Sequence, residues 1–390
     1  MFETAYIAIA VFMAIFSLYG ILLSYRVCLM PNRCVPASGT MPPVSLIIPC
    51  KGDEPGLELA LAAHFNHDYP RYEIVFAVDS PDDSAVPVIR NLMQRHPSRP
   101  AKLVVAPQLP DCVAKISNQF AAIEAANPAT EIFAFADSDG MVRDEQWLTS
   151  LVRPLETHDV SSGFRWYFPE SRGLSARFHA AWDSALCMLH ANTGTVWGGA
   201  MAFRKSFMQK MDLLAAWRTA ATDDLMVKKR CDAVGGRVAF APGAMVISEP
   251  IEALVPLWSW SVRQTLLVRA TTFKVFARAG AFSCMFALYY AATLAAFTWP
   301  GAVTTILLPA CALAIHALLI IGRVAMRRQA MFHLFPDHQA RLRHIRWHFA
   351  IFLPVADIVS FFVVVRAAIA RGFVWRGIRY RIAKDGIVRV

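Results

Sequence analysis

Charged residues are scarce in this chain of 390 residues. Asp, Glu, Lys and Arg together make up 17% of it, hydrophobic residues make up 56%, and the mean hydropathy is +0.40. This composition excludes an ordinary soluble protein of this length. The hydrophobic excess lies towards the two ends of the chain, so the sequence predicts one soluble domain with membrane segments on both sides of it.

Several motifs are absent, and each absence argues against a class of protein. The eight cysteines include no Cys-x-x-Cys pair and no Cys/His group at zinc spacing, so they indicate neither a zinc site nor a disulfide framework. No Gly-x-Gly-x-x-Gly follows the first predicted strand and no Walker A sequence occurs, which argues against dinucleotide and P-loop sites. The basic residues are not interleaved with aromatic residues on a soluble face, so no nucleic-acid partner is expected.

Long apolar runs lie at both ends of the chain. Residues 4–23 are uncharged and long enough for one membrane crossing, and no positive residue precedes them as in a signal peptide. Residues 282–297 and 302–321 predict a membrane hairpin, joined by the turn residues 298–301. We expect helices that anchor the protein in a membrane, most plausibly the bacterial inner membrane.

A third apolar run, residues 349–365, is interrupted by Pro354 and Asp357. A third full crossing would leave the basic carboxyl terminus outside, so a re-entrant or interfacial segment is expected instead. From Arg323 to the end, 13 Lys and Arg stand against 3 Asp and Glu, and such a tail next to apolar helices predicts contact with anionic headgroups. Arg26, just after the first run, places the amino terminus outside and the soluble domain in the cytoplasm.

The soluble part alternates strands with helices. Short apolar segments predict strands at 44–50, 72–78, 101–105 and 132–136, and the intervening segments predict helices at 57–64, 85–95 and 116–126. This order predicts an α/β domain with a mostly parallel sheet and helices on both faces. The expected organisation is a transmembrane anchor at 1–30, a linker at 31–43, the soluble domain at 44–276 and a membrane region at 277–390, the last divided into a hairpin at 281–322, an apolar segment at 347–366 and the basic tail.

Acidic residues cluster where ligands of such a sheet would bind. Asp137 and Asp139 follow the run 132–136, and ligands of open α/β sheets bind at the carboxyl ends of the strands. Two carboxylates at this spacing share one hard divalent cation, which the phosphates of a substrate can bridge. Two further clusters are Asp79/Asp82/Asp83 and Asp223/Asp224.

Several segments in register match a known family: Asp68-Tyr69-Pro70-Arg71, Asp82-Asp83, Lys115 with Asn118, Asp137-Ser138, Gly198-Gly199-Ala200-Met201, Asp223-Asp224-Leu225-Met226, Gly235-Gly236-Arg237 and Trp375-Arg376. Over residues 44–276 the chain resembles the inverting glycosyltransferases of family 2 and, within them, family 21, the ceramide glucosyltransferases, with hopanoid glycosyltransferases as close relatives. The resemblance implies a GT-A fold. Of the family's Gln/Arg-x-x-Arg-Trp motif, Arg263 is retained, and Gln264 stands in place of the tryptophan.

The residue types suit sugar transfer from a nucleotide. Asp137 and Asp139 are expected to hold Mg²⁺ or Mn²⁺ at the diphosphate. Asp224, with Asp223 as the alternative, is expected to be the general base that accepts the proton of an acceptor hydroxyl. Four further residues are expected to bind the donor: Asp82 or Asp79 at the uridine, Lys115 at the diphosphate and Gln264 beside it. Arg263 adds a second positive charge at the diphosphate.

Each of these assignments has a structural alternative. Asp82 could cap a helix, the Asp137 turn could be a plain acidic turn, and Asp223-Asp224 could begin a helix. Lys115 could be a solvated helix residue, and Arg263 could anchor the domain at the headgroups.

The sequence therefore predicts a membrane-bound inverting glycosyltransferase that moves a hexose from a UDP-sugar to a lipid hydroxyl, with ceramide glucosyltransferase-like activity favoured by the resemblance. A hopanoid or another lipid alcohol would meet the same physical requirements as an acceptor. A processive polysaccharide synthase and a non-catalytic sugar-nucleotide-binding membrane protein are the alternatives. The synthase usually needs more membrane helices and an intact Gln-x-x-Arg-Trp.

Overall fold

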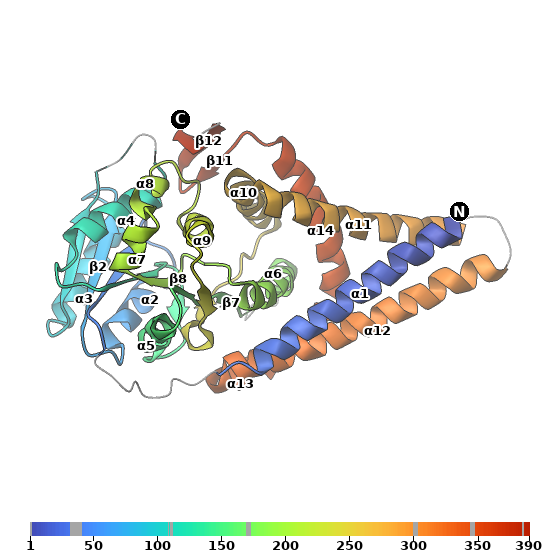
Figure 1. Cartoon of the computed structure of the whole chain (residues 1–390), viewed down its shortest axis with the longest axis horizontal. Coiled ribbons are helices and arrows are strands. Elements are labelled where there is room, and N and C mark those ends of the chain that lie inside the picture. The colour runs from blue at the N-terminus through green and yellow to red at the C-terminus, as the bar shows by residue number, and fades with distance from the viewer. Residues whose placement is uncertain are drawn as a thin grey trace.

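The computed structural model describes the chain except for residues 1, 32–40, 108, 110–111, 169–172, 299–302, 344–347 and 384–385. An α/β domain forms one end of the molecule, and long helices extend from it (Figure 1). The predicted linker at 31–43 and the turn at 298–301 lie largely outside the described residues.

A seven-stranded sheet forms the centre of the α/β domain. Its strand order is β3-β2-β1-β4-β8-β6-β9, and β8 is antiparallel to both of its neighbours while the other pairs are parallel. The strands are β1 (Val44–Pro49), β2 (Tyr72–Val78), β3 (Ala101–Val105), β4 (Ile132–Ala136), β6 (Val160–Ser162), β8 (Ala200–Arg204) and β9 (Val238–Phe240). The predicted mostly parallel sheet is confirmed.

Helices cover both faces of this sheet, which is why β1, β2 and β4 are mostly apolar and buried at every residue. The polar exceptions, Ser45 of β1 and Glu73 of β2, form a hydrogen bond with each other (2.6 Å). The helices of the domain are α2 (Leu57–Ala63), α3 (Ala85–Arg95), α4 (Ala114–Ala125), α5 (Trp147–Val152), α6 (Leu174–Thr193), α7 (Lys205–Lys210), α8 (Leu213–Trp217), α9 (Asp223–Ala233) and α10 (Leu254–Thr271). The strands and helices predicted before residue 137 are confirmed to within two residues at each end.

Two small sheets complete the described structure. One has the order β5-β10-β7 and contains β5 (Met141–Val142), β7 (Arg165–Tyr167) and β10 (Val246–Ser248). The other is formed by the carboxyl-terminal tail as an antiparallel sheet of β11 (Gly372–Trp375), β12 (Ile378–Ala383) and β13 (Gly386–Arg389). In Figure 1 this tail lies against the α/β domain near α10.

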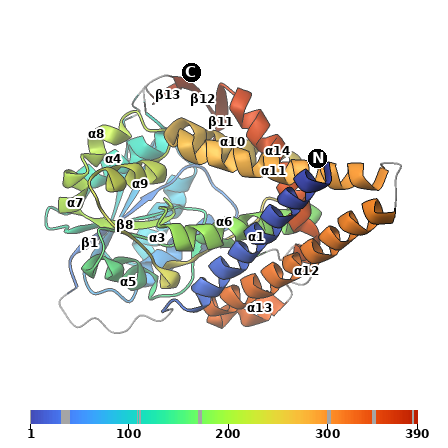
Figure 2. The same cartoon turned by 45° about the vertical axis from the view of Figure 1, so that its right-hand side comes forward.

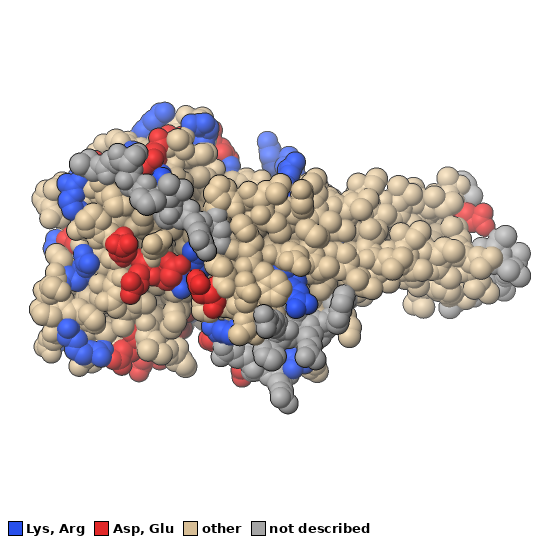
Figure 3. All heavy atoms as spheres, turned by 90° about the horizontal axis from the view of Figure 1, so that it is seen from below, with Lys and Arg blue, Asp and Glu red and all other residues tan. Residues whose placement is uncertain are grey.

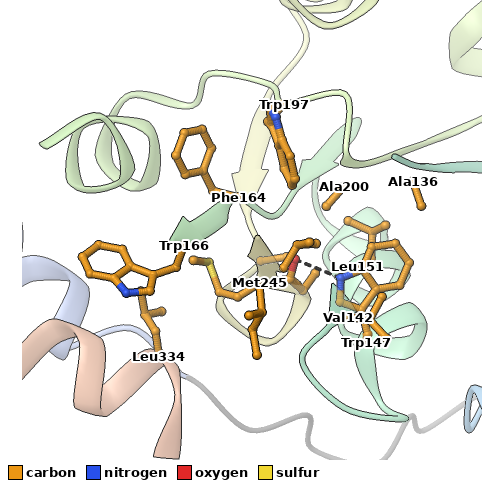
Figure 4. Close-up of a cluster of buried hydrophobic side chains, with 14 of the residues drawn as sticks. Ala136, Val142, Trp147, Leu151, Phe164, Trp166, Trp197, Ala200, Met245 and Leu334 are labelled. Carbon is orange, nitrogen blue, oxygen red and sulfur yellow. Dashed lines mark hydrogen bonds between the residues drawn. The ribbon is translucent and has the colours of Figure 1, made fainter. Parts of the chain in front are cut away.

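The core of the α/β domain continues into the long helices. One cluster of buried side chains joins strands β1, β2 and β4 to Val27 near the end of α1 and to Leu334 near the end of α12. Figure 4 shows part of this cluster, in which Leu334 lies beside Trp166 of β7 and Trp147 donates a hydrogen bond from Nε1 to the carbonyl oxygen of Ala244 (3.1 Å). Because apolar burial is shared across this boundary, the long helices and the α/β domain form one packed unit.

In the described part of the chain, four helices are long and apolar enough to cross a membrane: the candidate spans lie in α1 (Phe2–Cys28), α11 (Phe273–Thr298), α12 (Val303–Leu334) and α14 (His348–Ile369). A short helix, α13 (Gln339–Arg343), lies between the last two. On the face drawn in Figure 3, charged side chains gather over the α/β domain and are few along the extended part. This distribution fits a membrane-embedded region.

Helix α14 differs from the sequence-based expectation in one respect. Pro354 and Asp357 were expected to interrupt it, but it is a continuous helix of 22 residues with Pro354 inside it. A proline in a helix removes one backbone hydrogen bond, and helices in apolar surroundings tolerate that loss where neighbours pack closely. Figures 1 and 2 show α14 crossing the line of α11, whereas α1 and α12 run lengthwise beside each other.

Candidate active site

The carboxylates of Asp137 and Asp139 follow β4, at the carboxyl end of the parallel strands. Strand β8 runs antiparallel to β4 and pairs Ala200 with Ala136, so the residues that precede β8 pass beside this turn. Gly199 comes so close that a Cβ atom there would lie 2.8 Å from Asp137 Oδ2. The same Cβ atom would lie 2.3 Å from the ring of Trp197, so a side chain at this position would displace both the ring and the carboxylate.

Lys115 connects two of the predicted acidic clusters from the first turn of α4. Its Nζ lies 2.8 Å from Asp137 Oδ1 and 3.1 Å from Asp223 Oδ2. Gln119, one turn further along α4, donates to the same Asp223 oxygen at 2.7 Å. Burial alone would lower the pKa of Lys115, but the charges of Asp137, Asp223 and Asp224 outweigh burial and raise it. The ammonium group therefore stays charged and holds the acidic clusters together.

Asp224 is held in place by backbone and hydroxyl donors. Gly198 N donates to its Oδ2 at 3.0 Å, Leu225 N donates to its Oδ1 at 2.7 Å, and the Thr222 hydroxyl donates to the same Oδ1. A Cβ atom at Gly198 would lie 2.8 Å from Asp223 Oδ2, so the close approach of this backbone depends on glycine. The carboxylate is thus oriented before any substrate binds.

Asp224 and its neighbour Asp223 have different surroundings. Burial raises the pKa of Asp224, and the charge of Asp223 raises it further, while Lys115 opposes the change. The Asp223 carboxylate is engaged by Lys115 and Gln119, and its carbonyl oxygen accepts a hydrogen bond from Trp217 Nε1 (3.0 Å). Asp224 is therefore the better placed of the two to accept a proton.

A cavity of about 160 Å³ opens beside Asp137, Ser138 and Asp139. Among the described residues, the basic side chains that line it are Lys51, Lys115, Arg165, Arg263 and Arg376. Five basic side chains against two carboxylates leave a formal excess of three positive charges. This cavity, called the polar cavity below, suits an anionic ligand such as a diphosphate.

Arg263 contributes an unpaired guanidinium group to the polar cavity. Among the described residues it has no carboxylate or carbonyl partner, and it lies over the ring of Trp375 with 5.5 Å from its Cζ to the ring centroid. Burial, followed by the charges of Arg376 and Arg165, lowers the pKa of Arg263 to about 10. It remains protonated at neutral pH and is available to an incoming anion.

Asp139 is the carboxylate most available to a metal ion. Within the described part of the chain it has no hydrogen-bond or ion-pair partner, and burial, then the charges of Asp137 and Glu54, raise its pKa to about 6. No group of three or more His, Cys, Asp and Glu side chains among the described residues could hold a metal alone. Asp137 and Asp139 would therefore hold a divalent cation only together with further oxygen ligands from outside the protein, such as phosphate or water.

A second cavity, of about 490 Å³, adjoins the first and is called the apolar cavity below. Asp224 and Thr222 stand on its wall at the α/β domain, and apolar side chains of α6, α10, α11 and α14 line the rest, among them Leu186, Leu267 and Phe276. The residues that line both cavities are Lys115, Asp137, Arg165, Trp260, Arg263, Gln264 and Trp375. The site therefore joins a basic compartment to an apolar one at the acidic clusters.

The structure gathers most, but not all, of the predicted site residues. Lys115, Asp137, Asp139, Asp223, Asp224, Arg263 and Gln264 line one or both cavities. Asp79 and Asp82 are not among the described lining residues: Asp79 forms an ion pair with Lys51, and the Asp82 side chain is exposed. The side chain of this cluster that bonds to the start of α3 is Asp83, whose Oδ1 accepts a hydrogen bond from Ala85 N at 2.9 Å, while the N-cap position itself is Ser84. Donor binding by Asp79 or Asp82 stays a prediction.

Two arginines of the site were not predicted from the sequence. Arg165, at the start of β7, is half-buried and lines both cavities, and its Nη2 lies 3.5 Å from Asp183 Oδ1 on α6. No motif singles it out, because its position depends on the small second sheet. Arg376 lies in the basic tail that was expected to contact headgroups, but its guanidinium is paired with Glu54 at 3.0 Å inside the α/β domain. For this residue the expectation was wrong.

Comparison with known proteins identifies relatives of the chain. The family model for glycosyl transferase family 21 matches residues 4–388. The chain is 33% identical to ceramide glucosyltransferase 3 of Caenorhabditis elegans over 126 residues. This aligned stretch covers 32% of this chain and 27% of that protein. Over 73 residues it is 30% identical to the ceramide glucosyltransferase of Komagataella phaffii, 19% of this chain and 14% of that protein. The matched stretches thus span less than a third of these relatives.

A solved structure shares the fold. The mannosyltransferase PcManGT from Pyrobaculum calidifontis, in complex with GDP-Man and Mn²⁺, is similar over 93% of this chain and 97% of its own, with a TM-score of 0.53 and 18% sequence identity. The expected GT-A fold with apolar helices at both ends is confirmed by this likeness and by the sheet described above.

Proposed function

Since the chain belongs to glycosyl transferase family 21, we propose that it is a membrane-bound enzyme that transfers a hexose from a UDP-sugar to the hydroxyl group of a lipid. The observation that carries this proposal is the junction of the polar cavity with the apolar cavity at Lys115, Asp137 and Arg263. A nucleotide sugar needs the charged surroundings of the polar cavity, and a lipid needs the surroundings of the apolar cavity. Transfer requires that donor and acceptor meet where the two cavities join.

The donor diphosphate would lie in the polar cavity. Arg263 offers an unpaired guanidinium, which binds phosphate oxygens in pairs. Asp137 and Asp139 would hold Mg²⁺ or Mn²⁺ there, and the cation would neutralise the diphosphate as it leaves. Lys115 keeps Asp137 in position and adds positive charge at the same place. The excess positive charge of the cavity supports this placement.

The acceptor hydroxyl would approach from the apolar cavity, and Asp224 would be the general base. As the hydroxyl oxygen forms a bond to the anomeric carbon, its proton passes to the Asp224 carboxylate. The bond from that carbon to the diphosphate breaks, and the diphosphate leaves with the electron pair. Attack from the side opposite the leaving group inverts the anomeric centre, and an oxocarbenium-like transition state needs no covalent intermediate.

The membrane region would present the lipid to this site. The apolar cavity is walled by Val275 and Ala279 of α11 and by Val363 and Val364 of α14. A lipid tail can therefore remain among these helices while its headgroup reaches Asp224. Arg26, which follows the amino-terminal helix, supports a cytoplasmic α/β domain, and a bacterial inner membrane would suit this orientation.

We further propose that α14 lies at the junction of membrane and domain and does not cross the bilayer. Its first turns carry Phe349 and Leu353, which pack in the same core as Phe335 and the central sheet. Its last turn carries Ala367, which packs against Leu266 of α10. Both ends thus contact the same side of the protein, which a spanning helix would not do. This placement keeps the basic tail beside the α/β domain.

Ceramide is the acceptor proposed first, because the curated relatives are named ceramide glucosyltransferases. A hopanoid or another lipid alcohol would suit the same cavity. A processive polysaccharide synthase is less well supported, because Gln264 replaces the family tryptophan. A protein that binds a sugar nucleotide without catalysis is less well supported because Asp224 is pre-oriented by three donors.

The test is a transfer assay in membranes that contain the full chain. Radiolabelled UDP-glucose and UDP-N-acetylglucosamine are supplied with Mg²⁺ or Mn²⁺ and with ceramide or extracted lipids as acceptors. Label in a product soluble in organic solvent is expected. Label in an insoluble polymer would instead indicate the processive synthase. Binding of UDP without any transfer to these acceptors would indicate the non-catalytic protein.

Filling the apolar cavity is expected to weaken use of the acceptor. In Ala279→Trp the larger side chain would enter the cavity and raise the KM for the lipid about tenfold, because overpacking costs about 1–3 kcal/mol. The KM for the UDP-sugar should stay within about twofold. Ala277→Trp is the matched control, because Ala277 is exposed on the same helix and is not among the described lining residues. Equal effects of the two variants would contradict the proposed path of the lipid.

The pH dependence of transfer is expected to reflect the raised pKa of Asp224. A general base works only when deprotonated, so kcat/KM should fall as the pH drops through a value above the ordinary 3.8 of aspartic acid. Burial and the charge of Asp223 set this direction, and Lys115 and the Thr222 hydroxyl oppose it. Thr222→Val removes a donor to the charged form, so the acidic limb should move to higher pH, whereas Thr222→Ser should leave it in place. An unmoved limb in Thr222→Val would exclude Asp224 as the titrating base.

A further inference from the structure

The hairpin formed by β11 and β12 reaches the polar cavity from the far end of the chain. Four of its residues, Trp375, Arg376, Ile378 and Tyr380, are among the described residues that line this cavity. Neither the acidic clusters nor the general base assigned above explains why the tail of the protein should lie there.

Specific contacts fix this hairpin to the segments that carry the site. The hydroxyl oxygen of Tyr380 accepts a hydrogen bond from Ala114 N (3.3 Å), immediately before Lys115. Arg376 donates from Nη1 to the carbonyl oxygen of Lys51, and its Nη2 lies 3.0 Å from Glu54 Oε1. The hairpin is therefore attached to the loop after β1 and to the amino-terminal end of α4.

The turn of the hairpin carries an arginine at a position that favours other residues. Trp375 pairs with Ile378, and the two residues between them have positive φ angles, 47° for Arg376 and 77° for Gly377. A two-residue turn of this kind is usually Asn-Gly, because a longer side chain is strained at positive φ. The backbone of this turn therefore does not favour arginine. The contacts that the Arg376 side chain makes must account for its presence.

The side chain of Arg376 reaches the polar cavity, which the other candidate diphosphate-binding residues also line. Trp375, next to it, lies against the guanidinium of Arg263. Asp139, Arg263 and Arg376 all line the polar cavity. The three side chains thus face one small cavity from three separate parts of the chain.

We propose that the carboxyl-terminal hairpin completes the donor site and that Arg376 binds the diphosphate of the nucleotide sugar, with Trp375 orienting Arg263 for the same purpose. The inference rests on the proposed function. When the donor binds, the guanidinium of Arg376 exchanges its contact with Glu54 for phosphate oxygens, which it can bind in pairs. Arg263 and Arg376 then hold the diphosphate from two sides.

Binding of UDP and of uridine to the purified full chain, with Mn²⁺ present, tests this inference. Arg376→Asn gives the turn its preferred Asn-Gly sequence, so the hairpin should fold while the guanidinium is lost. We expect the Kd for UDP to rise about tenfold and the Kd for uridine to stay unchanged, because uridine has no phosphate. Arg376→Lys should recover part of the affinity for UDP. Arg379→Gln, an exposed residue of the same hairpin, should bind both ligands as the unmodified protein does.

The outcomes separate this inference from the proposed function. If the unmodified protein binds UDP and Arg376→Asn binds it equally well, the role of Arg376 is wrong while the proposed function stands. If Arg376→Asn weakens UDP and uridine alike, the hairpin supports the site without contacting the diphosphate, and the inference is also wrong. If the unmodified protein does not bind UDP, the assignment of a UDP-sugar donor fails and this inference fails with it.

Discussion

Replacing Asp224 by asparagine is expected to lower kcat for sugar transfer by about 10³-fold while the Kd for UDP stays within about twofold. The variant keeps the shape of the side chain but removes the carboxylate proposed to accept the proton, and general-base catalysis contributes about 10²–10⁴-fold. The effect should exceed the lower end of this range, because the carboxylate is held by Gly198 N, Leu225 N and the Thr222 hydroxyl in a fixed orientation. Single-turnover transfer of labelled sugar and UDP titration provide the two measurements.

Asp232→Asn is the matched control for this change. Asp232 lies on the same helix, its side chain is 57% exposed, and it pairs with Lys228 at 2.5 Å on the surface. Its replacement should leave kcat and the affinity for UDP unchanged. If Asp224→Asn retained full activity and Asp223→Asn lost it, the base would be Asp223, and its contacts with Lys115 and Gln119 would have to open during the reaction.

Replacing Asp139 by asparagine is expected to abolish the effect of Mn²⁺ on UDP binding and to lower transfer by about 10²-fold or more. Asp139 faces the polar cavity and has no protein partner among the described residues, so the carboxylate is available to a cation. An amide oxygen binds a hard cation more weakly than a carboxylate oxygen, and a bound cation supplies several kcal/mol of charge stabilisation to a leaving diphosphate. UDP titrations with and without Mn²⁺ test the binding part without any need for turnover.

Asp212→Asn controls for the loss of one negative charge. Its side chain is 72% exposed, and its φ of 47° is a conformation that asparagine also adopts. The control should keep the response of UDP binding to Mn²⁺. The metal assignment would be wrong if Asp139→Asn kept that response too, or if a chelator left UDP binding to the unmodified protein unchanged.

Local patterns in the sequence were enough to predict most of the central sheet. Segments such as 72–78 and 132–136 are apolar apart from Glu73 because the strands are covered by helices on both faces, so they can be recognised without any knowledge of distant contacts. The acidic turn at Asp137 could be predicted for the same reason, because it follows directly from the end of a recognisable strand. Helix α14 was misjudged because Pro354 was weighed without the neighbours that pack around the helix.

The small sheet and the tail could not be predicted in this way. Strand β7 has three residues and pairs with β10, more than 80 residues away, so Arg165 gives no local signal of its place in the site. Arg376 comes from the basic tail, where charge density alone suggested headgroups. Its pairing with Glu54 depends on a hairpin that folds back across the domain.

The sequence by itself determined the alternation of strands and helices, the apolar runs at both ends and the acidic clusters, because each of these depends on neighbours within a few residues. The tertiary structure alone decided how the two neighbouring carboxylates of the last acidic cluster differ. Asp223 and Asp224 are adjacent and chemically identical, but Lys115 and Gln119 on α4 occupy the first, whereas Gly198 before β8 orients the second. This difference between the two carboxylates arises only when α4, α9 and the segment before β8 are packed together. It therefore cannot be predicted from any single stretch of the sequence.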